Sequence, residues 1–220
     1  MKKLAVLLTL CVLVMGVSAQ AAETFIRAND VVSATYYYHN TDPVTWHGNY
    51  FGQEVKNFWK FPLATLAAEA SEGNSIQINS ATLILICESS YPSSQMPTQT
   101  LYQVQDNNWE ENFTIENAPT FNDTITTFGY TDSFGGVYID VKDYLQSRLD
   151  SDATHIAFGG YGISPYVDED DGNMFRMVSL GYGYDEHYAP KIIIDYTVVP
   201  EPVTLITLAL GGLALVRRKK

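Results

Sequence analysis

The chain has 220 residues and a formal net charge of -12, from 13 Lys and Arg against 25 Asp and Glu. Its 46% hydrophobic content excludes a disordered chain, and its acidity argues against a nucleic-acid partner, because phosphate binding needs clustered basic residues. Two cysteines are too few for a disulfide scaffold.

The first 21 residues are typical of a secretory signal peptide. Lys2 and Lys3 precede an apolar run over residues 4–17, which is followed by the small residues of 18–22. A cationic start, a short apolar middle and an Ala-x-Ala step are the features that signal peptidase recognises. We expect cleavage after Ala21, or after Ala19 at the latest, and therefore export.

Short β-like runs separated by Gly, Asn, Asp, Ser and Pro follow through the middle of the chain, which predicts an all-β sandwich or barrel. The run 81–87 is apolar on both faces, as in a covered central strand, so Cys87 is expected to be an inert core thiol. Trp59 and Trp109 lie beside apolar strand residues and are expected in the core. Strands are expected at 24–27, 35–38, 57–61, 81–87, 100–104, 137–140, 154–158, 174–180 and 191–198.

One short helix is predicted after Asp140. Apolar residues recur there at helical spacing, and Asp140 either caps the helix or ends the preceding strand. The spaced residues are Val141, Tyr144, Leu145 and Leu149.

The acidic run 168–173 is the densest group of oxygen ligands in the chain. Ca²⁺ takes six to eight oxygen ligands, but the run does not fit the EF-hand spacing, and adjacent carboxylates cannot all face one ion. A solvated hairpin tip and a loop Ca²⁺ site both remain open. The candidate ligands are Asp168, Asp170, Asp171 and Asn173.

Two aromatic patches are candidates for stacking against sugar rings, whose flat C–H faces match exposed Tyr and Trp. Their members sit in loop-like surroundings, where a core role and a platform role are equally supported. The candidate platform residues are Trp46, Tyr50, Tyr182 and Tyr184.

No catalytic pattern is found. Gly-x-Ser-x-Gly and phosphate-binding Gly loops are absent, and His39, His47, His155 and His187 lack metal-ligand spacing. The sequence predicts a protein that is not an enzyme and needs no cofactor apart from a possible Ca²⁺ ion.

The last 21 residues combine three features in order: Pro200-Glu201-Pro202, an apolar run over 203–216, and the basic end Arg217, Arg218, Lys219 and Lys220. The apolar run is short for a bilayer, and the basic end should stay on the cytoplasmic side. This order resembles the PEP-CTERM sorting signal, which implies a transient membrane helix and removal of the tail by the protease exosortase.

Removing both ends leaves residues 22–199 as the mature domain, with seven basic residues, 24 acidic residues and a net charge of -17. Several of its segments lie in the same order as motifs of one family. They are Thr24-Phe25-Ile26-Arg27, Asn57-Phe58-Trp59-Lys60-Phe61, Ile78-Asn79-Ser80-Ala81-Thr82-Leu83, Trp109-Glu110-Glu111 with Asn117-Ala118-Pro119, Ile139-Asp140-Val141, and Ala189-Pro190-Lys191-Ile192.

This series resembles the DNRLRE (disaggregatase-related) domain, a carbohydrate-binding-module-like unit. The sequence departs from the family pattern at Pro62 and at Ile115-Glu116. The resemblance implies a jelly-roll-like β-sandwich, often found beside polysaccharide-degrading enzymes, in which some members bind acidic polysaccharides. A domain at -17 should repel a polyanion, so that ligand is not transferred here.

The sequence therefore predicts three parts: a signal peptide (1–21), a DNRLRE-like β-sandwich (22–199) and a sorting signal (200–220). We expect a cell-surface or matrix protein that binds extracellular polysaccharide without catalysis. A structural surface-layer protein with no small ligand is the alternative, and a polysaccharide hydrolase or lyase is the third hypothesis.

Overall fold

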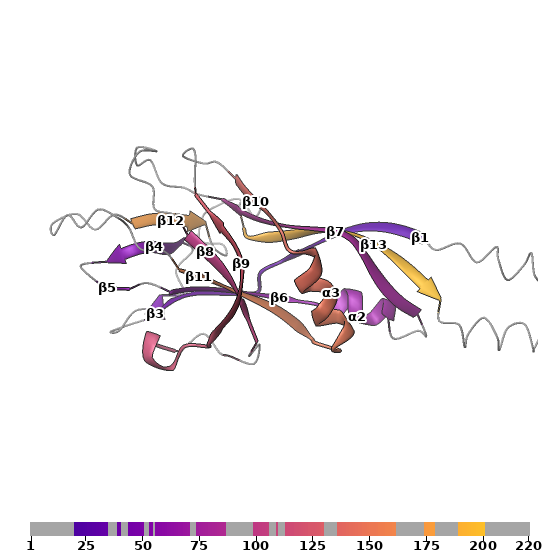
Figure 1. Ribbon diagram of the computed structural model, residues 1–220, viewed down its shortest axis with the longest axis horizontal. Helices are drawn as coiled ribbons and strands as arrows, with labels where there is room; N and C mark the ends of the chain where they lie inside the picture. The colour runs from indigo at the N-terminus through magenta and orange to yellow at the C-terminus, as the bar shows by residue number, and fades with distance from the viewer. Residues whose placement is uncertain are drawn as a thin grey trace, which may run out of the picture.

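The computed structural model describes residues 20–34, 39–40, 44–50, 53–54, 56–70, 74–86, 99–105, 109, 113–129, 136–161, 174–178 and 189–200. These residues form two antiparallel β-sheets that face each other, with a smaller third sheet (Figure 1). This arrangement confirms the predicted β-sandwich. Within the described ranges, no helix is both long enough and apolar enough to cross a membrane.

Sheet A has four strands, and the two ends of the described chain lie next to each other in it. Gln20 at the start of β1 pairs with Val198 near the end of β13, so both ends leave from one end of the sheet (Figure 1). In spatial order the strands are β1 (Gln20–Arg27), β13 (Lys191–Pro200), β7 (Asn74–Ile86) and β10 (Gly136–Asp140).

Sheet B has six strands, and β6 and β11 at its centre are buried along most of their length. In spatial order its strands are β3 (His39–Asn40), β2 (Asp30–Ala34), β6 (Lys56–Pro62), β11 (His155–Tyr161), β8 (Gln99–Val104) and β9 (Phe121–Phe128).

The third sheet consists of β12 (Met174–Val178), β4 (Val44–Tyr50) and β5 (Gln53–Glu54). Its strand β4 contacts β2, β6 and β11 of sheet B, while β12 contacts β7 of sheet A. The third sheet therefore touches both layers of the sandwich.

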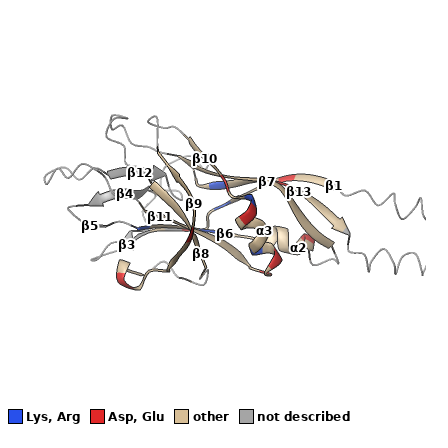
Figure 2. Ribbon diagram, viewed as in Figure 1, with Lys and Arg blue, Asp and Glu red and all other residues tan. Residues whose placement is uncertain are grey.

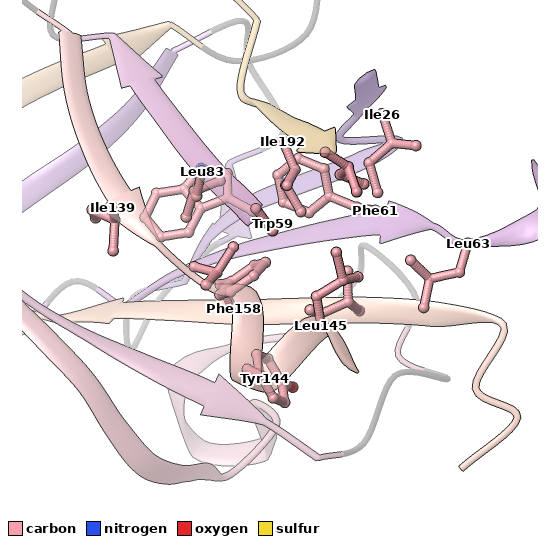
Figure 3. Close-up of a cluster of buried hydrophobic side chains, with 14 of the residues drawn as sticks. Ile26, Trp59, Phe61, Leu63, Leu83, Ile139, Tyr144, Leu145, Phe158 and Ile192 are labelled. Carbon is pink, nitrogen blue, oxygen red and sulfur yellow. The ribbon is translucent and has the colours of Figure 1, made fainter. Parts of the chain in front are cut away.

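The main core fills the space between sheets A and B (Figure 3). Alternate residues of each strand point inward, so that Leu83 and Ile192 of sheet A meet Trp59 and Phe158 of sheet B. Phe158 packs edge-on against Phe61, with ring centres 5.7 Å apart. Burial of such large apolar side chains is the main stabilising term of the fold.

Helix α3 (Lys142–Asp150) follows β10 directly, where the sequence predicts a helix. Tyr144 and Leu145 are buried in the core, and Leu149 packs against it. Asp140 ends β10, and its carboxylate also accepts a hydrogen bond from the Lys142 backbone N–H at 2.9 Å. Of the two roles considered for Asp140, the structure confirms the end of the strand, whereas the N-cap residue of the helix is Val141.

Two residues of α3 fix it to the sheets by hydrogen bonds. The Tyr144 hydroxyl lies 2.9 Å from the carbonyl oxygen of Val104 and 3.0 Å from that of Ala157. The Gln146 side chain accepts from the Ile78 N–H at 2.8 Å and donates to the Ile76 carbonyl at 3.0 Å. Gln146 thus pairs with the free edge of β7 much as a neighbouring strand would.

The prediction of a single helix is wrong. A second helix, α2 (Ala64–Ala70), follows β6 and buries Leu66, and a 3₁₀ turn, η2, spans Ile115–Asn117. Strands β2, β3, β4, β5 and β9 were not predicted either. Residues 35–38 and Cys87, to which the sequence assigned strands, lie outside the described residues.

Candidate functional site

Most residues that the sequence nominated as a site lie outside the described part of the chain. Trp46 and Tyr50 fall in strand β4 rather than in a loop, but their side chains are outside the description. Tyr182 and Tyr184 are outside it entirely, as is the acidic run 168–173. Among the sorting residues only Pro200 is described, as the last residue of β13, whose backbone partner is Asn74.

The two other tryptophans lie in the core, as predicted. Trp59 is fully buried between the sheets, and Trp109 belongs to a second apolar cluster. Phe58 and Phe113 form the centre of that cluster, with ring centres 5.0 Å apart. Neither tryptophan is available to a ligand.

The second cluster covers part of the outer face of sheet B. Cross-strand partners share a face, so the register places Phe58, Gly159 and Tyr102 in one row across this sheet. Phe121 lies over Gly159 and stacks on Tyr102, with ring centres 4.9 Å apart and an angle of 12° between the planes. Tyr102 is half-buried at the margin of the cluster.

The outer face of sheet A is different, because three of its large apolar side chains are exposed, although Ile84, between Lys191 and Tyr138, is buried. Phe25, Tyr138 and Ile193 have 57%, 69% and 38% of their surface exposed. The register places Phe25 beside Ile193, and Tyr138 in the neighbouring row. Three strand spacings of about 4.8 Å separate β1 from β10, so this face is roughly 14 Å wide.

The Tyr138 ring lies back along its own strand. A Cβ atom at Gly136 would be 3.0 Å from Cε2 of Tyr138 and 3.1 Å from its hydroxyl oxygen. The ring tip therefore leans over Gly136, where a glycine leaves room for it. Most of the Tyr138 residue is nevertheless exposed to solvent, so its ring is accessible to a ligand.

At the opposite edge of the face, Phe25 and Arg27 line an open groove of about 450 Å³. The Arg27 guanidinium carbon lies 5.4 Å from the centre of the Phe25 ring, in cation–π contact. Glu23, Thr24, Lys191 and Ile193 complete the lining. The groove thus combines an apolar ring with charged hydrogen-bonding groups, the mixture found in ligand sites.

Charged side chains on this face lie next to side chains of the same charge on the neighbouring strand. Arg27 is the cross-strand partner of Lys191, and Glu23 is the cross-strand partner of Asp195. Lys191 begins β13, where Figure 2 shows a basic segment. Two of the seven basic residues of the predicted mature domain therefore lie side by side here.

The titratable groups with shifted pKa values are structural. Burial, followed by the nearby charge of Lys60, lowers the pKa of His155, whose Nδ1 is 3.0 Å from the Thr154 hydroxyl. Burial also raises the pKa of Tyr144 and of Tyr196, and Glu69 raises that of Tyr196 further. Among the described residues, no three His, Cys, Asp or Glu side chains are arranged to hold a metal ion.

The sequence did not nominate Phe25 or Tyr138. Residues 24–27 and 137–140 were both predicted as strands, and Ile26 and Ile139 do point into the core. Strict alternation then sends Phe25 and Tyr138 to the other face. Whether Phe25 and Tyr138 share one face of the same sheet depends on the register between the strands. No local sequence pattern reveals this register.

Residues 18–164, well over half of the chain, match the sequence model of a family described as carbohydrate-binding module family 96. The match includes Phe25, Arg27 and Tyr138 but ends before β13, which supplies Lys191 and Ile193. No curated protein matches the chain.

Proposed function

The chain belongs to carbohydrate-binding module family 96, and from this we propose that it binds an extracellular polysaccharide on the outer face of sheet A without cleaving it. A module of this kind holds a glycan and leaves any bond cleavage to other proteins. Trp46, Tyr50, Tyr182 and Tyr184 remain a second candidate platform for the same glycan.

The observation that carries the proposal is the pair of exposed rings at opposite edges of one sheet face. Tyr138 is exposed at the β10 edge, and Phe25 lines the groove at the β1 edge. A polysaccharide lying across the strands can contact both rings, because roughly 14 Å separates the two edge strands. Ile193 supplies apolar surface next to Phe25.

A glycan array with the full chain tests this function, and it should include both neutral and acidic polysaccharides. We expect Tyr138→Ala and Phe25→Ala each to weaken binding about tenfold through loss of a stacking surface. Tyr102→Ala is the matched control, because Tyr102 lies on the outer face of the opposite sheet.

Three outcomes would contradict the proposal. Silence across the array favours the structural surface-layer hypothesis. Loss of binding with Tyr102→Ala but not with Tyr138→Ala moves the ligand to sheet B. Release of reducing ends from a bound polysaccharide shows a hydrolase or lyase.

Export and sorting belong to the same proposal and are supported by the sequence at the two ends. Signal peptidase removes residues 1–21, and exosortase recognises Pro200, Glu201 and Pro202 and releases the tail, leaving the module at the cell surface or in the matrix. Mass spectrometry of the native protein measures both termini. A mature protein that keeps residues 203–220 contradicts the sorting step.

Calcium binding by Asp168, Asp170, Asp171 and Asn173 also remains a proposal. The melting temperature of the full chain should rise with millimolar Ca²⁺ and not with Mg²⁺, which prefers a smaller and more rigid site. No shift with Ca²⁺ means that this run is a solvated acidic loop.

A further inference from the structure

A second groove lies at the end of the sandwich where helices α2 and α3 are next to each other (Figure 1). Its volume is about 410 Å³, within the range of about 300–1,000 Å³ that is typical of ligand pockets. Its floor is apolar, because Ala70, Leu149 and Ala153 pack there against the main core. Both helices contact β7 and bury side chains in that core, so this helix-end groove is separate from the outer face of sheet A.

Two carboxylates give the helix-end groove a negative charge. Asp150 is the last residue of α3, and Asp152 follows it in the next turn. The Asp150 carboxylate accepts a hydrogen bond from the Gln146 amide at 2.9 Å, a neutral donor that leaves the charge in place. The C-terminal end of α3 adds partial negative charge at the same point. A cationic group therefore fits this part of the groove.

The turn that carries the two carboxylates is held by backbone hydrogen bonds. The Asp152 N–H donates to the Leu149 carbonyl oxygen at 3.0 Å, and the Ala153 N–H donates to the Arg148 carbonyl oxygen at 3.0 Å. Asp152 has a φ of 54°, the left-handed conformation that often closes a helix and that Asp adopts more readily than most residues. Because the carboxylates are held in place before a ligand arrives, binding costs less ordering entropy.

The neutral part of the rim supplies acceptors as well. The Asn74 amide donates to the Glu69 carbonyl oxygen at 3.5 Å, and the Ser75 hydroxyl donates to the Val199 carbonyl oxygen at 3.4 Å. These bonds use their donors and leave lone pairs on their side-chain oxygens. The rim is thus rich in acceptors, and a matching ligand must be rich in donors.

We propose that the helix-end groove binds a hexosamine unit with a free ammonium group, as in a deacetylated amino-sugar polysaccharide. The ammonium group donates to Asp150 and Asp152, and the sugar hydroxyls donate to Asn74 and Ser75. The C–H groups of the ring lie against the apolar floor. The net charge of -12 attracts such a polycation from a longer distance. The groove does not involve the rings of sheet A, so this proposal and the proposed function can fail separately.

Isothermal titration calorimetry of the full chain in a mild detergent tests the site. The probe is fully deacetylated chitotriose, and its N-acetylated twin is the matched ligand without charge. We expect the deacetylated trimer to bind with a Kd below about 1 mM and the N-acetylated trimer to bind at least about tenfold more weakly. Absence of binding by the deacetylated trimer at that concentration, or equal affinity for the two trimers, overturns the proposal.

Neutralising the two carboxylates tests their role. Asp150→Asn/Asp152→Asn keeps the size of both side chains and should weaken binding of the deacetylated trimer at least about tenfold. Asp123→Asn/Asp143→Asn is the control, because it removes the same charge at exposed positions that do not line the groove. Equal losses for the two double variants indicate general attraction to an acidic chain and overturn the site.

Filling the groove tests its location. Ala67 lines it from the exposed side of α2, so Ala67→Trp should block binding, whereas Ala68→Trp on the same helix lies outside the lining and should not. Circular dichroism checks that each variant is folded. Unchanged binding by folded Ala67→Trp overturns the proposal. Loss of this binding with Phe25→Ala or Tyr138→Ala, but not with the variants of the groove, also overturns it.

A polyamine distinguishes a sugar site from a site for any organic cation. Spermine carries ammonium groups without hydroxyl groups or a sugar ring, so it can use the carboxylates but not the rest of the rim. We expect it to bind at least about fivefold more weakly than the deacetylated trimer. Equal or tighter binding of spermine contradicts the assignment to an amino sugar.

Discussion

The Lys60 ammonium group donates a hydrogen bond to the Trp109 carbonyl oxygen at 2.9 Å and lies 4.5 Å from the centre of the Trp109 ring. It also forms an ion pair with Asp30 of the neighbouring strand. One buried cation thus ties β2 and β6 to the segment that covers the outer face of sheet B. The side chains of Lys60 and Asp30 are only 11% and 21% exposed, so water screens this pair weakly.

Replacing Lys60 should destabilise the fold more than replacing another lysine of the same strand. Lys60→Met leaves the Asp30 carboxylate and the Trp109 carbonyl without this partner, and we expect a loss of about 2–3 kcal/mol in the free energy of unfolding. Urea denaturation measures the loss. Lys56→Met is the control, because Lys56 lies on the same face and contacts the Phe121 ring at 5.5 Å. Equal losses for the two variants would contradict the assignment.

Gly159 should not tolerate a side chain. A Cβ atom there would lie 2.1 Å from Cε1 of Phe121, so Gly159→Ala must displace the Phe121 ring and should cost about 1–3 kcal/mol. Gly129→Ala is the matched control, because no atom lies within 4 Å of its added Cβ. Thermal denaturation distinguishes the two, and adding Phe121→Leu to Gly159→Ala should recover part of the loss. A Gly159→Ala protein as stable as the wild type would refute the close contact.

The Gln146 side-chain amide should stabilise the edge of β7 at Ile76 and Ile78. Gln146→Leu removes its hydrogen bonds to the backbones of Ile76 and Ile78, and we expect a loss of about 2 kcal/mol. Amide hydrogen exchange at Ile78 should accelerate as well, which global destabilisation alone would not confine to this site. Lys142→Gln, on the exposed side of the same helix, should change neither quantity. Unchanged protection at Ile78 in Gln146→Leu would count against this role.

His155 should titrate below its ordinary pKa of 6.5, because burial and then the Lys60 charge disfavour the imidazolium. A lowered pKa means that the unfolded chain takes up the proton more readily. The stabilising contribution of His155 is therefore complete above pH 6.5 and declines as the pH falls through the lowered pKa. NMR of the imidazole protons measures the value, with His155→Gln to assign the signal. Lys60→Met should raise this pKa, and a wild-type value at or above 6.5 would contradict the environment described.

The helices and strands that were predicted correctly are those with a clear spacing of apolar residues within a few positions of the chain. Helix α3 was predictable because Tyr144, Leu145 and Leu149 repeat at helical spacing over nine residues. Helix α2 was missed because it has seven residues and buries only Leu66, which is too little for a periodic signal. Strand β7 was predicted only from residue 81, although Ile76 and Ile78 alternate with polar residues in its earlier half, as in a half-buried strand.

The candidate site depends on long-range pairing, which a single sequence does not display. Phe25 and Tyr138 are more than 100 positions apart, and two intervening strands bring them onto one face. The like-charged pairs Arg27–Lys191 and Glu23–Asp195 arise from the same pairing of β1 with β13. By contrast, the burial of Trp59 and Trp109 followed from their immediate apolar neighbours and was predicted correctly.

Because Gln20 and Val198 are neighbours, this domain is suited to insertion into another protein. Opposed residues of antiparallel strands have Cα atoms about 5 Å apart, close to the gap that a host protein's surface loop leaves when it is opened. The described sandwich can therefore be spliced into such a loop with short linkers at each side, without stretching either partner. A fluorescent host carrying this insert would report the presence of its ligand on intact cells or in a biofilm.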